Sequence, residues 1–331
     1  MWPQVVAFST LVRAAERAAS GKRTSLAAAR FLERAEFEVL ALQRALEADE
    51  WRPGLGARFE ISDPKPRTIT AVPFRDQVVH HALIGVLQPH FERRMIHDSY
   101  ACRSGKGTHA ALRRAKAFVR ARRYFLKLDV RRFFDSLRHG VVHDTLGRIV
   151  KDRRVLGLCA RVLRGNEGQP DLGVGLPLGA LTSQWFANLA LGRLDHHVLE
   201  RLRPGGYVRY MDDFALFADE RAYLATAHAE IAEFLSERLE LELKERATIL
   251  APTTEGLPFL GWLIFPGLNR VRPENLRRYR WRLRLRRWQY ETGRCSEESY
   301  RRAVGSLYEL LRHGDTRELR RAWVRADRFD P

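Results

Sequence analysis

Apolar positions recur along the first ninety residues with two different periods. Residues 10–50 place apolar side chains on one helical face and charged side chains on the other, which predicts helices there, with Ser25 as an N-cap. In residues 51–74, Pro and Gly turns are followed by alternating β-branched residues around the sequence DPKP, which predicts a β-hairpin with a basic tip. Residues 75–95 predict another helix that ends near Pro89.

The middle of the chain alternates between helices and short strands. A glycine loop precedes a helix that we expect to begin at residue 109, with Thr108 as its cap. The apolar run 124–130 predicts a strand that ends at Asp129, and residues 141–164 predict a helical region. A Pro/Gly turn then leads into a long helix within GLPLGALTSQWFANLALGRLDHHVLERL.

The segment GGYVRYMDDFALFADE, residues 205–220, predicts a hairpin of two short strands around Asp212 and Asp213. Residues 221–240 predict an amphipathic helix, and ELKERATILAP and PFLGWLIFP are further candidate strands. Strands separated by helices, with carboxylates at a strand end and at a hairpin tip, predict an α+β fold in which helices back an antiparallel sheet.

Composition narrows the range of partners. The chain has 331 residues, is 45% apolar and carries a formal net charge of +18, which predicts a globular protein with a polyanionic partner such as nucleic acid. The alternative is that the positive charge forms only a solvated surface and binds no polyanion. The three cysteines lie far apart without zinc-site spacing, and no leader peptide or long apolar run is evident, so we expect reduced thiols in a cytoplasmic protein without a membrane span.

Asp212 and Asp213 are unexpected in an otherwise apolar hairpin, because like charges repel and buried carboxylates lose their hydration. Together with Asp129 on another strand, they offer the oxygen ligands that Mg²⁺ prefers. Two such ions about 3.5–4 Å apart stabilise the attacking and leaving oxygens of an in-line displacement at phosphorus. A bound cation would also remove the repulsion between the aspartates. The sequence therefore predicts a site for two divalent cations.

Tyr210-Met211-Asp212-Asp213 matches the YxDD box of reverse transcriptases, and the chain resembles this family from about residue 60 to residue 266. Further motifs support the resemblance because they occur in the family's order. They are PKPRTITAVPFRDQVVHHAL (64–83) and YACRSGKGTHAA (100–111) for the fingers, LDVRRFFDS (128–136) and GLPLGALTSQWFAN (175–188) for the palm, and PFLGWLIFP (258–266) for the primer grip.

The resemblance implies a right-hand polymerase. N-terminal helices and fingers would occupy residues 1–123, the palm 124–266 with interleaved fingers helices in 141–205, and a short basic helical thumb 267–331. The expected thumb contains 18 arginines, no lysine and 9 acidic residues, and should follow the backbone of a duplex. Its segment NLRRYRWRLRLRRWQY fits either a helix or a strand by periodicity; length and the resemblance favour a helix.

The catalytic roles follow from the resemblance. Asp129, Asp212 and Asp213, assisted by the backbone carbonyl of Val130, would hold two Mg²⁺ ions, with Mn²⁺ as the alternative. Lys244 occupies the position of a family lysine thought to protonate pyrophosphate; the alternative is a surface lysine.

The resemblance also implies a dNTP site. In the family, an aromatic residue at the position of Phe134 packs under the sugar and excludes a 2′-OH by its bulk. We also expect one of the two residues Phe133 and Phe134 to belong to the core. Basic residues of the fingers hairpin and the following helix would bind the triphosphate, unless they form only a solvated tip. The expected set is Lys65, Arg67, Arg75, Phe134, Leu178, Gly179 and Gln184.

Template RNA and a cDNA/RNA duplex are the expected macromolecular partners. The residues expected to contact them lie in the glycine loop, the YxDD box, the primer grip and the thumb. They are Arg103, Lys106, Tyr210, Met211, Leu260, Gly261, Trp262, Arg277, Arg280 and Arg284.

Leu178 and Gln184 depart from the commonest reverse transcriptase pattern, which has Gln and Pro at these positions. This variant is similar to the reverse transcriptases of diversity-generating retroelements, where it is associated with error-prone copying of template adenines. Losing a polar side chain beside the nucleotide removes a hydrogen bond that would test its position. The resemblance implies mutagenic retrohoming by a cytoplasmic, prokaryotic or phage-encoded enzyme with a small basic oligomeric accessory protein.

Other functions compete with this one. Within the family, a retron, group II intron-like or defence-associated enzyme is an alternative, although we expect no maturase, endonuclease or ribonuclease H segment after the thumb. An RNA-dependent RNA polymerase is disfavoured by Phe134 and by the YxDD box. A non-catalytic RNA-binding scaffold would use the same basic thumb, but three unpaired carboxylates would then be destabilising without benefit.

Overall fold

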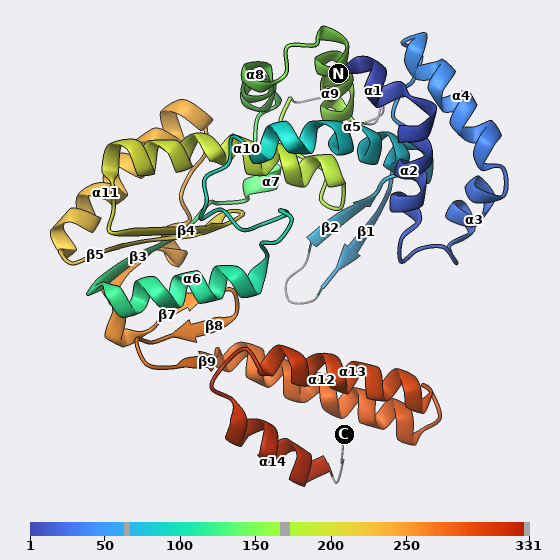
Figure 1. Ribbon diagram of the computed structural model, residues 1–331. Coiled ribbons are helices and arrows are strands. Elements are labelled where there is room, and N and C mark those ends of the chain that lie inside the picture. Colours follow the sequence, from blue (N-terminus) through green and yellow to red (C-terminus); the bar gives the residue numbers. More distant parts are fainter. Residues whose placement is uncertain (63–66, 166–172, 328–331) are drawn as a thin grey trace. The chain divides into compact units, whose positions relative to one another are not determined.

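The computed structural model describes residues 1–62, 67–165 and 173–327 (Figure 1). Contacts within the chain group it into two compact units. Lys65, an expected triphosphate ligand, lies outside the described residues. The first unit comprises Met1–Ser104, Val130–Arg203 and Ala229–Lys244, and the second comprises Gly105–Asp129, Pro204–His228 and Glu245–Pro331.

The first unit is mainly helical and carries one β-hairpin. Its elements are α1 (Trp2–Val6), α2 (Phe8–Ala19), α3 (Leu26–Glu33), α4 (Ala35–Glu47), β1 (Ala57–Ile61), β2 (Arg67–Ala71), α5 (Phe74–Glu92), α7 (Phe133–Ser136), α8 (His139–Ile149), α9 (Arg153–Arg164) and α10 (Leu181–His197). Helix α5 packs against α2 and α10, and α10 packs against α8. Apolar side chains such as Leu83, Phe91 and Trp185 are buried between these helices, and their removal from water stabilises the unit.

The local elements largely agree with the sequence pattern. Ser25 caps α3 by accepting a hydrogen bond from the backbone N–H of Ala28. The helical regions expected in 10–50 and 141–164 are each divided into shorter helices, and the hairpin expected in 51–74 is formed by β1 and β2 in antiparallel register.

Two local expectations were wrong. Helix α5 does not end near Pro89 but continues to Glu92, because Leu87 and Phe91 on either side of the proline are fully buried and their packing outweighs the lost backbone hydrogen bond. Thr108 is the first residue of α6 (Thr108–Ala121) rather than its cap; Gly107, with φ 100°, precedes the helix.

The second unit contains two antiparallel sheets. The larger sheet has the strand order β4-β5-β3-β6, and the smaller has the order β7-β8-β9. Their strands are β3 (Tyr124–Asp129), β4 (Gly206–Tyr210), β5 (Asp213–Ala218), β6 (Ile249–Pro252), β7 (Leu257–Phe259), β8 (Trp262–Ile264) and β9 (Asn269–Val271). The sequence correctly predicted β3 and the β4–β5 hairpin.

Helix α6 covers one face of the larger sheet (Figure 1). The ring of Phe118 on α6 stacks on Phe217 of β5 with 5.3 Å between the ring centroids. Gly206 permits this close approach, since a Cβ there would lie only 2.3 Å from Cδ1 of Phe118. Helix α11 (Arg221–Phe234) follows β5 and continues into a π-helical turn, Leu235–Leu239, so the predicted helix 221–240 is present.

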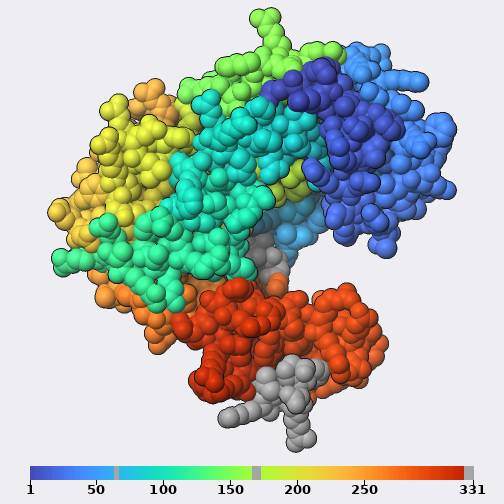
Figure 2. All heavy atoms as spheres, viewed as in Figure 1, coloured from blue at the N-terminus to red at the C-terminus, as the bar shows by residue number. Residues whose placement is uncertain are grey.

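Three helices end the second unit: α12 (Pro273–Glu291), α13 (Glu297–Leu311) and α14 (Arg317–Asp327). Helix α12 packs against α13, and the rings of Tyr290 and Tyr300 stack where the two helices join. All residues of α12 are described and none of them is buried. In Figure 2, atoms with the orange-red colours of the C-terminal helices are visible at the surface. The segment that fitted either a helix or a strand is therefore a helix. Across the described residues, we find no helix with the length and apolar character needed to span a lipid bilayer.

Candidate active site

Two of the three expected catalytic carboxylates are cross-strand neighbours in the larger sheet of the second unit. Strands β3 and β5 are antiparallel, and Asp129, the last residue of β3, pairs with Asp213, the first residue of β5. Directly opposed residues in such a ladder have Cα atoms about 4.5–5.5 Å apart. The third carboxylate, Asp212, lies in the turn that immediately precedes β5. The fold thus brings together residues that are more than eighty positions apart in the sequence.

The turn of the β4–β5 hairpin is held from within the sheet. Tyr210 pairs with Asp213, so Met211 and Asp212 form a two-residue turn, and Met211 adopts the left-handed conformation with φ 59°. The guanidinium of Arg209 is fully buried, and its Nη1 donates a 3.0 Å hydrogen bond to the carbonyl oxygen of Met211. Arg209 therefore supports the backbone that carries Asp212, a role that the sequence analysis missed.

Lys127 is a second residue that the sequence analysis missed. It lies two positions before Asp129 on β3, so both side chains point to the same face of the sheet. Its Nζ lies 2.7 Å from Oδ1 of Asp213 and also donates a hydrogen bond to the carbonyl oxygen of Leu128 at 2.9 Å. A lysine in a buried strand, with the i, i+2 spacing to a candidate catalytic aspartate, was the available signal.

Asp213 is the carboxylate most affected by its surroundings. Burial, opposed by Lys127 and reinforced by Asp129 and Asp212, raises the pKa of Asp213 to about 6. Burial dominates because the carboxylate loses hydration in the sheet, and the two neighbouring acids add repulsion. Lys127 therefore opposes the effects of burial and of the two neighbouring acids on Asp213.

The carboxylates fit a divalent cation by donor chemistry, since all three supply hard oxygen atoms. Among the described residues, however, no group of three or more His, Cys, Asp or Glu side chains is arranged closely enough to hold a metal ion. The backbone of Val130, the fourth expected ligand, follows Asp129 directly and forms an isolated bridge with Leu243. Lys244 comes immediately after that bridge in the chain and is partly exposed.

Tyr210 of the YxDD box is connected to the glycine loop. The hydroxyl of Thr108 at the start of α6 donates a 3.3 Å hydrogen bond to the hydroxyl of Tyr210. Lys106 lies in the same loop, between Gly105 and Gly107, which both have positive φ values. The structure therefore places the expected template loop beside the hairpin that carries Asp212.

The expected primer grip is the turn between β7 and β8. Leu260 and Gly261 both adopt positive φ values, 48° and 86°, and Trp262 is buried. The carbonyl oxygen of Gly261 accepts hydrogen bonds from the side-chain amide of Asn275 and from the backbone N–H of Arg272. This turn is consequently fixed to the start of α12.

On α12, Arg277, Arg280 and Arg284 are exposed and share one helical face, as their i, i+3 and i+7 spacing requires. No carboxylate in the described part of the chain lies within 4.0 Å of their guanidinium groups. Their positive charges are therefore not neutralised by ion pairs on the protein.

The described members of the expected dNTP-binding set lie in the first unit, and several are neighbours there. The backbone N–H of Thr70 on β2 donates to the carbonyl oxygen of Leu178 at 2.9 Å. Gly179 has φ 107°, and a Cβ at this position would lie 3.0 Å from the carbonyl oxygen of Thr70, so the contact needs a glycine. The same hairpin carries Arg67, which is exposed, and Arg75 is exposed on α5.

A cavity of about 360 Å³ lies beside this contact and is lined by Thr68, Thr70, Leu176 and Leu178, among others. Phe133 is buried in the core, whereas Phe134 is partly exposed, and its carbonyl oxygen accepts from the N–H of Leu176 at 2.7 Å. The expectation that one phenylalanine of the pair is a core residue is thus confirmed. The amide oxygen of Gln184 on α10 accepts a weak hydrogen bond from the thiol of Cys102.

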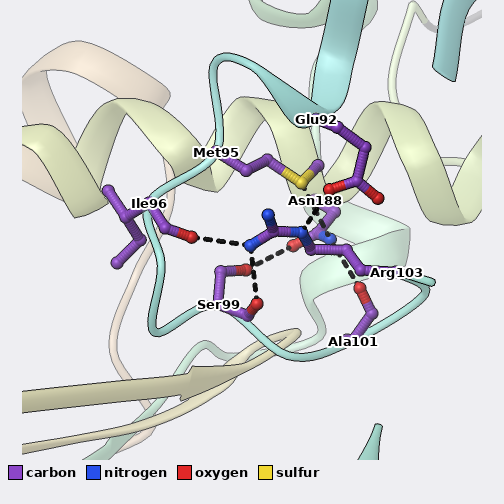
Figure 3. Close-up of polar contacts among 7 residues, drawn as sticks. All are labelled: Glu92, Met95, Ile96, Ser99, Ala101, Arg103 and Asn188. Atoms are coloured by element: carbon purple, nitrogen blue, oxygen red, sulfur yellow. Dashed lines mark hydrogen bonds and ion pairs between the residues drawn. The ribbon is translucent and has the colours of Figure 1, made fainter. Parts of the chain in front are cut away.

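Arg103 has a different environment from the one expected for a template ligand (Figure 3). Its guanidinium is nearly buried, pairs with Glu92 at 2.7 Å and donates to the carbonyl oxygens of Ile96 and Ser99. Asn188 of α10 anchors the same loop by donating to the carbonyl oxygen of Ala101. These contacts use Arg103 to hold the loop 96–103, which leaves less of its hydrogen-bonding capacity for a nucleic acid.

A family model described as "Reverse transcriptase (RNA-dependent DNA polymerase)" matches residues 62–264, more than half of the chain. The chain belongs to the reverse transcriptase family. This match includes β3 and β5, the two strands that carry Asp129 and Asp213.

Known members of the family extend the comparison. Nuclear intron maturase 1, a mitochondrial protein of Arabidopsis thaliana, is 36% identical over 28% of this chain and 13% of its own length. Protein YkfC of Escherichia coli is 23% identical over 68% of this chain and 70% of its own length. The chain thus spans most of one relative and a small part of the other.

Apo telomerase from Candida tropicalis, solved without its C-terminal domain, has a similar fold, with a TM-score of 0.52 and 12% sequence identity. The similarity covers 65% of this chain and 54% of the telomerase chain. It agrees with the right-hand polymerase fold, an α+β architecture with antiparallel sheets, that the sequence predicted.

Proposed function

We propose that this reverse transcriptase relative is an RNA-directed DNA polymerase that extends a primer by nucleotidyl transfer. The observation that carries the proposal is the register of β3 and β5, which sets Asp129 opposite Asp213 and next to Asp212. Burial and the neighbouring Asp129 and Asp212 raise the pKa of Asp213, so further positive charge bound there would stabilise its ionised form.

Two Mg²⁺ ions, or Mn²⁺ in their place, would supply the missing charge. Asp129, Asp212 and Asp213 would hold them with the carbonyl oxygen of Val130. When bound, such ions activate the primer 3′-hydroxyl and stabilise the charge that develops on the phosphate oxygens. Lys127 would keep Asp213 ionised and fixed in direction, and Arg209 would hold the turn that presents Asp212.

The first unit would select and orient the nucleotide. Arg67 and Arg75 are exposed cations that suit a triphosphate, and Phe134 is exposed enough to contact a sugar and exclude a 2′-hydroxyl. Lys244 would donate a proton to the leaving pyrophosphate. Arg277, Arg280 and Arg284 on α12, together with Lys106, would bind the backbone of the template and primer, whereas we assign Arg103 to holding its own loop.

Primer extension on an RNA template tests the proposal. The wild type should extend a DNA primer with dNTPs and Mg²⁺, and Asp212→Ala should lose extension while still binding the template–primer duplex. Glu233→Ala removes an exposed carboxylate on α11 and is the matched control. Failure of the wild type to extend any primer, with duplex binding retained, would instead support a non-catalytic RNA-binding scaffold. Extension with rNTPs in preference to dNTPs would support an RNA polymerase.

Two narrower functions remain in competition within the family. Leu178 and Gln184 support an error-prone enzyme of a diversity-generating retroelement, which would work with a structured RNA and a small basic accessory protein. The intron maturase among the relatives supports a group II intron-like enzyme instead. Sequencing of cDNA separates them: we expect frequent errors at template adenines and fewer in Leu178→Gln. Accurate copying by the wild type would favour the intron-like alternative.

A further inference from the structure

A second cavity in the first unit is surrounded by arginines. It has a volume of about 690 Å³ and lies between α8, α10 and the end of α11 with its π-helical continuation. Its charged lining consists of Arg94, Arg148, Arg193, Arg201 and Arg238, against a single acidic side chain, Glu200. None of these residues belongs to the candidate active site.

Three of these arginines form no ion pair within the described parts of the chain. Among the described residues, no carboxylate lies within 4.0 Å of the guanidinium groups of Arg148, Arg193 or Arg238. Burial, together with the charges of Arg148 and Arg238, lowers the pKa of Arg193, and Asp144 offsets this only in part. Like charges that converge on a partly buried guanidinium destabilise the protein unless an anion binds between them.

The part of the cavity lined by α10 can accept a planar ligand group. Gly192 of α10 is buried, yet a Cβ at its position would meet no atom within 4 Å, so the helix surface is open to the cavity there. Beside it, the rings of His197 and Phe234 stack with 4.4 Å between their centroids. The Nε2 atom of His197 is buried and has no hydrogen-bond partner among the described residues.

We propose that this cavity binds a backbone phosphate of single-stranded RNA together with the adjoining nucleoside. Guanidinium groups bind phosphate oxygens bidentately. The open backbone surface at Gly192 lies beside two stacked rings and a ring nitrogen without a hydrogen-bond partner. Such a surface suits a base better than it suits a carboxylate side chain. The volume lies in the range of pockets that hold small molecules of this size. The chain would then hold an RNA segment through residues that take no part in catalysis.

RNA binding in EDTA tests this inference without requiring polymerase activity. The full chain and an Arg148→Gln/Arg238→Gln variant would be titrated with labelled single-stranded RNA at several KCl concentrations, and fluorescence anisotropy would be recorded. Two lost phosphate contacts should reduce the slope of log K against log[KCl] by about 1.4. Arg23→Gln/Arg30→Gln removes the same charge from an exposed surface of the same unit and should leave the slope nearly unchanged.

A second variant removes the space and leaves the charge intact. Gly192→Leu would fill the cavity from α10, and we expect it to weaken RNA binding while thermal unfolding stays close to that of the wild type. An unchanged salt slope in Arg148→Gln/Arg238→Gln would overturn the inference. An equal loss of RNA affinity in this variant and in the control Arg23→Gln/Arg30→Gln would overturn it as well. Tighter binding of a glutamate-rich peptide than of RNA, lost in the same variant, would assign the cavity to an acidic protein segment. Absence of primer extension would contradict only the proposed polymerase function.

Discussion

The ammonium group of Lys127 lies 2.7 Å from Oδ1 of Asp213, the carboxylate that opens strand β5. Both side chains lie on the face of the sheet that also carries Asp129, and Lys127 is almost completely buried. This ion pair places a positive charge beside Asp213, whose neighbours Asp129 and Asp212 are also acidic. It therefore controls how readily Asp213 ionises and, under the proposed function, how readily it binds a cation.

Replacing Lys127 by methionine should shift the pH dependence of primer extension. Without the ammonium group, the pKa of Asp213 rises further above about 6, because burial and the neighbouring acids are then unopposed. We expect the acidic limb of the pH–rate profile to move upward by about one pH unit or more. Lys127→Arg keeps the charge and should leave the limb near its original position. If Lys127→Met loses activity equally at every pH, the residue has only a structural role.

The stability of the metal-free protein should depend on pH through Asp213. Its folded pKa of about 6 lies above the ordinary value of 3.8, so the folded state binds this proton more tightly than the unfolded state. The contribution of Asp213 to the free energy of unfolding is therefore favourable at low pH. It is lost as pH rises from about 4 through about 6, and the loss is at most on the order of 3 kcal/mol. The difference in unfolding free energy between wild type and Asp213→Asn, measured in EDTA, should follow this curve.

Addition of Mg²⁺ should raise the melting temperature above pH 6 and have little effect near pH 4, because the cation competes with protons for the carboxylates. Asp213→Asn should abolish most of this stabilisation. A pH-independent effect of Mg²⁺, equal in both proteins, would show that the ion binds elsewhere.

Gly179→Ala should weaken nucleotide binding. The substitution introduces a Cβ at 3.0 Å from the carbonyl oxygen of Thr70 and strains a backbone with φ 107°, so β2 must move. We expect the KM for dNTPs to rise roughly ten-fold, in line with strain of 1–3 kcal/mol. Gly147→Ala on α8, where a Cβ would meet nothing within 4 Å, serves as the control in steady-state kinetics. An unchanged KM would separate this contact from the nucleotide site.

Gly314→Ala should destabilise the packing of the connection between α13 and α14 on Trp262 of the smaller sheet. A Cβ at residue 314 would lie 1.9 Å from the ring of Trp262, and relief of such a clash costs about 1–3 kcal/mol. Gly305→Ala, in the interior of α13 with open space around it, should instead stabilise the protein by about 0.5–1 kcal/mol. Chemical denaturation measures both. If the free energy of unfolding changed in the same direction in both variants, the packing argument would be contradicted.

The sequence identified most elements because their signals are local. The strand ending at Asp129, the hairpin around Asp212 and the Ser25 cap each follow from short patterns of apolar, polar and turn residues. Pro89 and Thr108 were assigned wrongly for the complementary reason. Burial of Phe91 by distant helices keeps α5 intact beyond the proline. Gly107, and not Thr108, occupies the N-cap position of α6.

The supporting residues were harder to recognise, although the position of Lys127 in an apolar strand, two residues before Asp129, was a signal. Lys127, Arg209 and Arg103 are all basic residues in a strongly basic chain, and composition gives no reason to separate them from surface arginines and lysines. Each is buried against particular carboxylate or carbonyl oxygens that come from other strands and loops. Only the packed chain distinguishes a cation that supports the site from one that faces water.

The sequence by itself determined which residues carry oxygen ligands, how they are spaced within each motif, and which family the motifs resemble, because these properties depend on neighbours in the chain. The tertiary structure decided that Asp129 pairs with Asp213, that Lys127 neutralises part of their charge, and that five arginines surround one cavity. The physical reason is that register and charge compensation arise between segments far apart in sequence, where hydrogen bonding and burial select one arrangement among many.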